Sequence, residues 1–112
     1  WIARQNTFYE LIEFKPDKQP LGVYQNRKAY TQHVIETKKG DTLYMFSDGY
    51  ADQFGGERNK KLTRKKLKEI ILQQKGLPMH EQHANLQNFH SAYKGNTDQI
   101  DDILVMGVGI ER

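Results

Sequence analysis

Hydrophobic positions recur along the first half of the chain in short runs that favour strands. Residues 6–14, NTFYELIEF, mix apolar and polar side chains in a β-favouring run that ends at Pro16. Residues 30–37 and 42–46, YTQHVIET and TLYMF, are separated by a Lys-Lys-Gly-Asp turn and predict an antiparallel hairpin. Residues 15–22 contain two prolines, an aspartate and a glycine, and so predict a loop.

The second half of the chain changes to helical spacing. Leucine and isoleucine share one side of residues 63–74 and basic residues the other, which predicts a helix. A second helix is expected between Pro78 and Gly95. Residues 103–110, ILVMGVGI, are almost all apolar or glycine and predict a core strand buried on both faces. Strands, two helices and a last strand predict an α+β fold, a sheet covered by helices.

Composition narrows the class of protein. With 112 residues, 37% hydrophobic and 28% charged, the chain is expected to form one compact domain. There is no cysteine, which excludes disulfides, thiolate metal sites and a thiolate nucleophile, and favours a cytoplasmic setting. No apolar run approaches the roughly 20 residues needed to cross a bilayer, so we expect no membrane contact by this segment. A first residue of Trp1 rather than methionine predicts that the chain was cut from a longer one.

Two acidic sites lie at the ends of predicted strands. Asp48 follows one apolar strand, and the pair Asp101 and Asp102 precedes another. Carboxylates at adjacent strand ends can converge on one Mg²⁺ or Mn²⁺ ion, since these cations prefer oxygen ligands and retain several waters. The alternative is that Asp48 only marks an Asp-Gly turn, and that Asp101 and Asp102 cap or solvate a strand. Spacing alone does not decide between the two.

Three segments resemble a known family. Residues 40–56, GDTLYMFSDGYADQFGG, are similar to the second signature of the SpoIIE/RsbU-like metal-dependent (PPM-type) protein serine/threonine phosphatases. Upstream, Gln19 to Val23 resembles the Pro-Leu-Gly segment of that family. Downstream, Gln99 to Ile103 resembles its terminal Asp-Asp motif. The three segments occur in the family's order, which is far more specific than any one of them.

The resemblance implies a fold and a set of site residues. The fold would be an antiparallel β-sandwich flanked by helices. Asp48 would bind one metal, Asp101 would be a second carboxylate at the same ion, and Gly49 would allow the tight turn. Asp102 would orient a water or a ligand. Asp52 occupies the acidic position after the Ser-Asp-Gly, but we expect no direct role for it.

The chain departs from the family pattern in two ways. Leu104 stands where the terminal motif usually has a hydroxyl residue. The family's first signature, an aspartate followed by Gly-His-Gly, supplies the carboxylate that bridges two metals, and nothing similar occurs between residues 1 and 112. We therefore expect residues 1–112 to be the C-terminal part of the phosphatase domain, with an incomplete two-metal site and little activity alone.

The function implied by the resemblance is hydrolysis of phosphoserine or phosphothreonine on a bacterial regulatory protein, such as an antagonist of an anti-sigma factor. Two Mn²⁺ or Mg²⁺ ions would activate the attacking water. A sensor region is expected upstream, with which the full-length protein could be anchored in a membrane. Truncation of the domain would expose a sheet edge or an apolar face, and this predicts self-association into a homodimer. The alternative is a catalytically inactive module that keeps the phosphatase fold for signalling or binding.

Two further features have simpler interpretations. The histidines at 33, 80, 83 and 90 are expected to be structural, since zinc sites usually add cysteine or acidic partners at tight spacing. The basic run at residues 60–68 is expected to be a solvated helix face rather than a nucleic-acid site. Were this run to lie near the metal site, docking of a phosphoprotein would become the more interesting interpretation.

Overall fold

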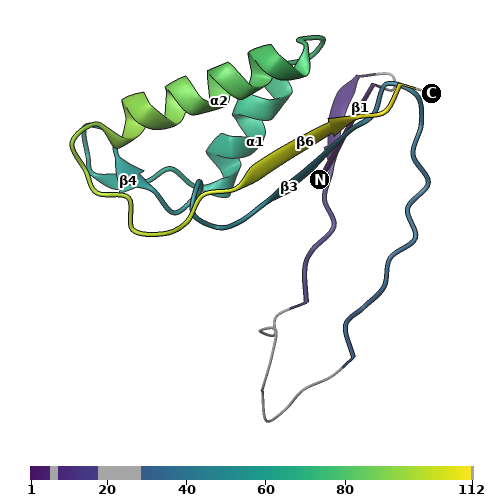
Figure 1. Ribbon diagram of the computed structural model, residues 1–112, viewed down its shortest axis with the longest axis horizontal. Helices are drawn as coiled ribbons and strands as arrows, with labels where there is room; N and C mark the ends of the chain where they lie inside the picture. Colours follow the sequence, from purple (N-terminus) through teal and green to yellow (C-terminus); the bar gives the residue numbers. More distant parts are fainter. Residues whose placement is uncertain (6–7, 18–28, 112) are drawn as a thin grey trace.

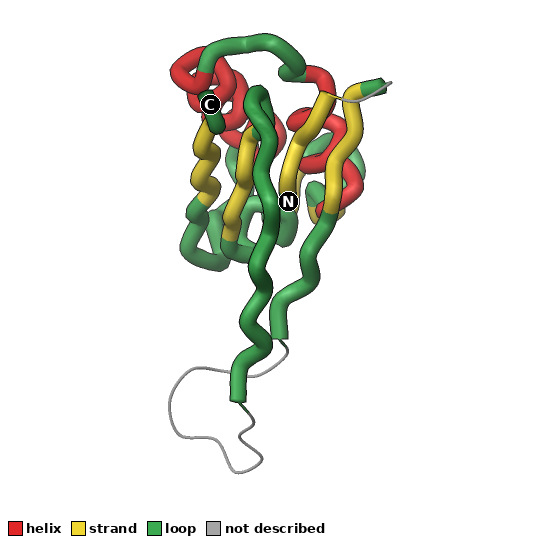
Figure 2. The backbone as a smooth tube through the Cα atoms, turned by 90° about the vertical axis from the view of Figure 1, so that its right-hand side faces the viewer, coloured by secondary structure: helices red, strands yellow, loops and turns green. Residues whose placement is uncertain are grey.

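The computed structural model describes residues 1–5, 8–17 and 29–111, which form two helices packed on one face of an antiparallel sheet (Figure 1). Figure 2 shows the strands side by side with the helices on their far side. Two segments without regular secondary structure, 13–17 and 29–38, project from this body in the same direction. Within the described ranges, no helix has the length and apolar character needed to cross a membrane.

The main sheet has four strands in the order β2-β1-β3-β6, and every neighbouring pair is antiparallel. In the pairing of β3 with β6, Thr42 lies opposite Gly109 and Phe46 opposite Val105. This register brings the residues that follow β3 next to those that precede β6. The strands are β1 (Ile2–Gln5), β2 (Tyr9–Ile12), β3 (Thr42–Phe46) and β6 (Val105–Gly109).

A second, two-stranded sheet consists of β4 (Phe54–Gly55) and β5 (Lys60–Lys61). A Cβ atom on Gly55 would lie 1.9 Å from the carbonyl oxygen of Tyr93, so only glycine fits at this position. The next residue, Gly56, donates its N–H to the same carbonyl at 2.9 Å. These contacts fix the small sheet to the end of the second helix.

Both helices form where the sequence predicts them. Helix α1 (Arg64–Gln73) begins at Thr63, whose hydroxyl oxygen accepts a hydrogen bond from the Lys66 N–H at 3.3 Å. Helix α2 (Met79–Lys94) begins directly after Pro78 and ends at Gly95, which has a φ of +53°. Both helices therefore begin where local residues indicate, and α2 also ends at the expected glycine.

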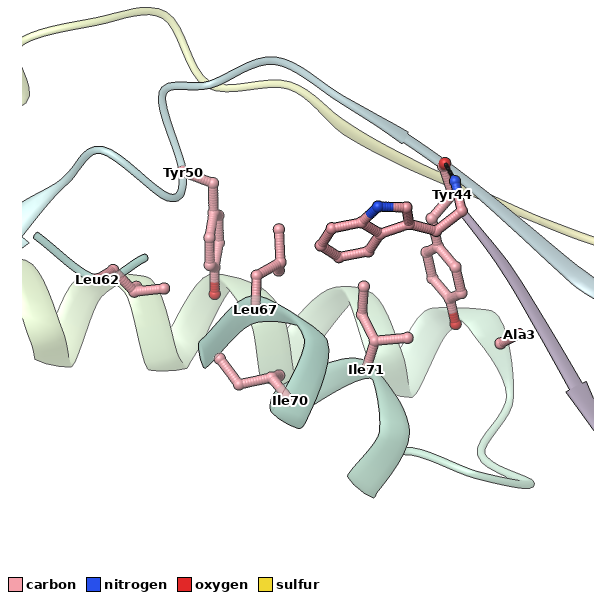
Figure 3. Packing of buried hydrophobic residues seen from close by; sticks show 8 residues of the cluster. Ala3, Tyr44, Tyr50, Leu62, Leu67, Ile70 and Ile71 are labelled. Atoms are coloured by element: carbon pink, nitrogen blue, oxygen red, sulfur yellow. Dashed lines mark hydrogen bonds between the residues drawn. The ribbon is translucent and has the colours of Figure 1, made fainter. Parts of the chain in front are cut away.

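The core lies between the helices and the sheet. Leu67 and Ile71 on α1 are fully buried and Ile70 is nearly so. They belong to one cluster with Tyr44 of β3 and with Tyr50, which follows that strand (Figure 3). Burial of these apolar side chains is the main stabilising contribution to the fold.

The expected hairpin of residues 30–37 with 42–46 is wrong in its first half. Residues 42–46 form β3, but residues 30–37 are exposed and contain no strand. Strand β3 pairs instead with β1, which the sequence did not predict, and with β6. The β-branched residues of 30–37 thus have strand propensity but no partner strand. Whether a segment becomes a strand depends here on pairing rather than on propensity.

The prediction for the last strand is only partly confirmed. Residues 105–109 form a strand, but it lies at the edge of the sheet and most of its residues are exposed. An edge position leaves one side of β6 without a neighbour among the described strands. Of the predicted loop, residues 15–17 have no regular structure, and the remainder, with the Pro-Leu-Gly segment at 20–22, falls outside the described residues.

Candidate functional site

The candidate site lies where β3 ends beside the start of β6. The backbone N–H of Ser47 donates to the carbonyl of Leu104 at 2.9 Å. The Ser47 hydroxyl donates to the carbonyl oxygen of Asp102 at 3.0 Å and accepts from the Leu104 N–H at the same distance. Two segments more than 50 positions apart in the sequence are thus held together by the serine of the Ser-Asp-Gly motif.

Gly49 allows these segments to approach closely. A Cβ atom at this position would lie 2.1 Å from the carbonyl oxygen of Asp102, well inside contact distance. Gly49 is not among the residues with positive φ, so close approach rather than an unusual backbone conformation explains the glycine.

The turn that carries Asp48 is anchored on α2. Tyr50 is 3% exposed, and its hydroxyl donates to the carbonyl of Leu86 at 2.7 Å. Burial raises the pKa of Tyr50 to about 12, so the phenol stays protonated and keeps this hydrogen bond at neutral pH. The backbone N–H of Asp52 closes the turn by donating to the carbonyl of Asp48 at 2.9 Å.

The Asp48 side chain points into solvent and forms an ion pair. Arg64, the first residue of α1, donates from Nη2 to Asp48 Oδ1 at 2.8 Å. The side chain of Asp48 is 62% exposed and that of Arg64 is 50% exposed. Both residues line a cavity of about 380 Å³ beside the end of β3. Asp48 is thus accessible, and its nearest charge is a guanidinium.

Asp101 and Asp102 are also exposed but are engaged separately from Asp48. Asp101 Oδ1 accepts from the backbone N–H of Asp102 at 2.8 Å, within its own turn. Gln99 donates from Nε2 to the carbonyl of Asp101 at 2.9 Å. The fold therefore brings the Asp48 and Asp102 segments together, while the carboxylates of Asp48 and Asp101 each have a different hydrogen-bond partner.

The donor set fits part of a metal site. Carboxylate oxygens are the ligands that Mg²⁺ and Mn²⁺ prefer, and Asp48 and Asp101 lie on accessible turns at one end of the sheet. In the part of the chain that the structure describes, no group of three or more histidine, cysteine, aspartate or glutamate side chains is placed to hold a metal ion. The chain can thus offer two carboxylates, and a complete site needs further ligands, water among them.

Three other residues considered as candidates, Asp52, His90 and His33, have neighbours of their own. Asp52 lies 3.8 Å from the ammonium of Lys61, a weak surface ion pair. The ring of His90 packs against Tyr50 with 5.0 Å between centroids, and burial lowers the pKa of His90, which keeps it neutral. His33 is exposed and lies near Phe14. The structural role expected of the histidines remains a prediction.

Arg64 is the residue that sequence reasoning missed. In the sequence Arg64 is one cation of the basic run 60–68 and belongs to no motif of its own. Because Arg64 directly follows Thr63, the sequence places it in the first turn of α1. No local pattern shows that this turn faces Asp48.

Comparisons with known proteins agree with this architecture. The family model described as Stage II sporulation protein E (SpoIIE) matches residues 3–111. The structure is similar to the SiaA-PP2C domain of Pseudomonas aeruginosa, with a TM-score of 0.65 and 25% sequence identity. The similarity covers 69% of this chain and 31% of that one, so the matched part is less than a third of that chain's length. No curated protein sequence matches the chain.

The expected α+β fold is confirmed by the antiparallel sheet with its two helices and by the likeness to a PP2C domain. The SpoIIE model covers nearly the whole chain, including the turn after β3 and the segment before β6. The chain therefore belongs to the SpoIIE family of PPM-type phosphatases.

Proposed function

We propose that the intact protein is a phosphatase that hydrolyses phosphoserine or phosphothreonine on a partner protein. The observation that carries this proposal is the junction of the Ser47–Gly49 turn with residues 102–104 at one end of the sheet, in a chain of the SpoIIE family. The junction places two acidic turns side by side on rigid strands, as a site for an oxygen-preferring cation requires.

Each residue of the junction has a physical task in this proposal. Asp48 and Asp101 would hold Mn²⁺ or Mg²⁺ through carboxylate oxygens. Bound there, the ion would supply an acidified water and neutralise charge on the phosphoryl oxygens. Ser47 keeps the two turns in register, and Gly49 permits their close approach. The Asp102 carboxylate would orient a water or a ligand at the edge of the site.

The family resemblance supports a proposal for the substrate class and the cellular setting. We propose a phosphorylated regulatory protein of a bacterial signalling pathway as the substrate. A sensor region in the same polypeptide would control the phosphatase, and the reaction would take place in the cytoplasm. The chain spans less than a third of the SiaA-PP2C chain, so these proposals concern the whole protein.

The test is Mn²⁺-dependent phosphate release by the intact protein from a phosphoserine peptide. Asp48→Asn and Asp101→Asn should each reduce kcat/KM by about 10²-fold or more, because each removes a charged oxygen ligand. Asp98→Asn is the matched control, since Asp98 is exposed and lies outside the junction. Wild-type rates in both site variants would refute the proposed site.

The alternative function is a signalling or binding module with the phosphatase fold but no catalysis. The pairing of Asp48 with Arg64 favours it, because the carboxylate proposed to bind a cation is here neutralised by a side chain. Failure of the intact wild-type protein to release phosphate at saturating Mn²⁺, while it still binds the phosphopeptide, would support this alternative.

A further inference from the structure

Arg64 stands beside the candidate metal ligand although it belongs to none of the three motifs. We propose that Arg64 binds the phosphoryl group of the substrate and positions it next to Asp48. This inference rests on the proposed function, and it adds a substrate-binding residue from α1 to a site otherwise built from strand ends.

The backbone holds Arg64 at a defined place relative to Asp48. The preceding residue, Thr63, donates its N–H to the carbonyl of Ala51 at 2.8 Å, within the turn that carries Asp48. Thr63 has a φ of +81°, a conformation rare for a β-branched residue that persists only where surrounding contacts impose it. The helix start and the Asp48 turn are thus tied together, which keeps the backbone of Arg64 beside the site.

The guanidinium can exchange its present partner for a phosphoryl group. The contact with Asp48 uses Nη2, and the planar group carries five N–H donors that match phosphate oxygens in pairs. Both side chains are at least half exposed, so solvent screens the ion pair and it contributes little to stability. When a cation takes the Asp48 carboxylate, the guanidinium loses its present partner, and the other carboxylate of the turn, Asp52, is paired with Lys61.

The surroundings leave room for a phosphorylated segment. Arg64 and Asp48 line the same cavity of about 380 Å³, within the usual size range of ligand sites. Lys15 adds a second cation to the lining, whereas the carboxylate of Glu13 is already paired with Lys68 at 2.7 Å. Apolar side chains, Phe46 among them, form much of the rest of the lining. With Asp48 bound to a cation and Glu13 paired with Lys68, a phosphate group at Arg64 would meet two cationic side chains, Arg64 and Lys15.

The experiment measures binding of inorganic phosphate to the intact, Mn²⁺-saturated protein by calorimetry, together with kcat and KM for a phosphoserine peptide. Arg64→Gln should weaken phosphate binding by about tenfold or more, because hydrogen bonds to a charged partner are lost. It should raise KM and lower kcat/KM. Arg64→Lys should recover part of the loss, since it keeps the charge but not the paired donors.

Lys65→Gln is the matched control. Lys65 follows Arg64 on the same exposed turn and forms no ion pair within the described part of the chain, so both variants remove one positive charge. It should change phosphate affinity by less than about twofold. Arg64→Gln should leave Mn²⁺ affinity undiminished, because it removes a competitor for Asp48, and should melt at the wild-type temperature. Phosphate affinities equal in the two variants would overturn the inference.

The two proposals fail in different ways. Phosphate binding that depends on Arg64 in a protein that releases no phosphate would contradict the phosphatase and keep Arg64 as an anion-binding residue. Mn²⁺-dependent catalysis that is equal in Arg64→Gln and Lys65→Gln would keep the phosphatase and overturn the role of Arg64. A wild-type protein that does not bind phosphate at all would also overturn it.

Discussion

Asp41 links two strands that are distant in the sequence. Its side chain is 1% exposed and accepts hydrogen bonds from Arg4, from Nε at 3.0 Å and from Nη2 at 2.7 Å. The backbone N–H of Lys38 donates to the same carboxylate at 2.8 Å. Because Arg4 belongs to β1 and Asp41 directly precedes β3, this ion pair supports the pairing of the two strands.

We expect Asp41→Asn to lower the free energy of unfolding at neutral pH by about 2 kcal/mol. This is less than the roughly 3–5 kcal/mol lost when one of two fully buried partners is removed, because the Arg4 side chain is 15% exposed. Asp52→Asn is the control, since its pair with Lys61 is exposed and should contribute less than about 1 kcal/mol. Urea unfolding of the intact domain measures both variants. Equal losses of unfolding free energy would contradict the stabilising role of the Arg4–Asp41 ion pair.

The same ion pair predicts a pH dependence. The Arg4 guanidinium, through its hydrogen bond, lowers the pKa of Asp41 in the folded protein. The stabilisation is therefore complete above the pKa of the unfolded chain, about 3.9, and is lost as the pH falls through the lower folded value. Unfolding curves between pH 6 and pH 3 should show a smaller loss of stability in Asp41→Asn than in the wild type.

At the scale of elements, the sequence predicts those helices and strands whose position is determined by neighbouring residues in the chain. Both helices could be located because the residues that cap them, such as Thr63 and Gly95, act within one turn of the chain. Strand β1 and the edge position of β6 could not be predicted, because each depends on a partner strand far away in the sequence. The apolar residues of β6 indicated a strand but not how many neighbours it has.

The same distinction applies to the site. Asp48 and Asp101 could be proposed from motifs of a few residues. Arg64 could not, because its distance from Asp48 depends on how the 15 intervening residues fold into a turn and the small β4–β5 sheet. A site residue that is brought in from another element, as Arg64 is, can be identified only from the structure.

The junction between the Asp48 turn and β6 yields a further prediction. Gly49→Ala would place a methyl group 2.1 Å from the Asp102 carbonyl oxygen, so the two segments must separate. We expect a loss of about 1–3 kcal/mol in unfolding free energy together with weaker Mn²⁺ binding. Gly109→Ala is the control, because a Cβ atom there contacts nothing within 4 Å. Denaturation and Mn²⁺ titration of both variants measure this, and wild-type behaviour of Gly49→Ala would contradict the packing.

At the scale of the whole molecule, one face of the sheet is covered and the other is open. The helices cover the face that carries Tyr44, while Met45, Met106 and Val108 are 57%, 45% and 44% exposed. Met45 and Met106 lie opposite each other in the pairing of β3 with β6, so they share a face. Self-association through exposed apolar residues remains a prediction.

The fold brings residue 48 and residues 101–102 to the same end of the sheet, although more than 50 positions separate them in the sequence. The site therefore acts as a unit only if Asp48 and Asp101 bind the same ion. Neither carboxylate alone makes a divalent cation site.

The most direct test is a double-mutant cycle on Mn²⁺ affinity in the intact protein, measured by electron paramagnetic resonance titration. Asp48→Asn and Asp101→Asn should each raise the Mn²⁺ dissociation constant by about tenfold or more. The double variant should bind little worse than the weaker single variant, because ligands of one ion are energetically coupled. Wild-type affinity in either single variant, or effects that simply add, would contradict a shared ion.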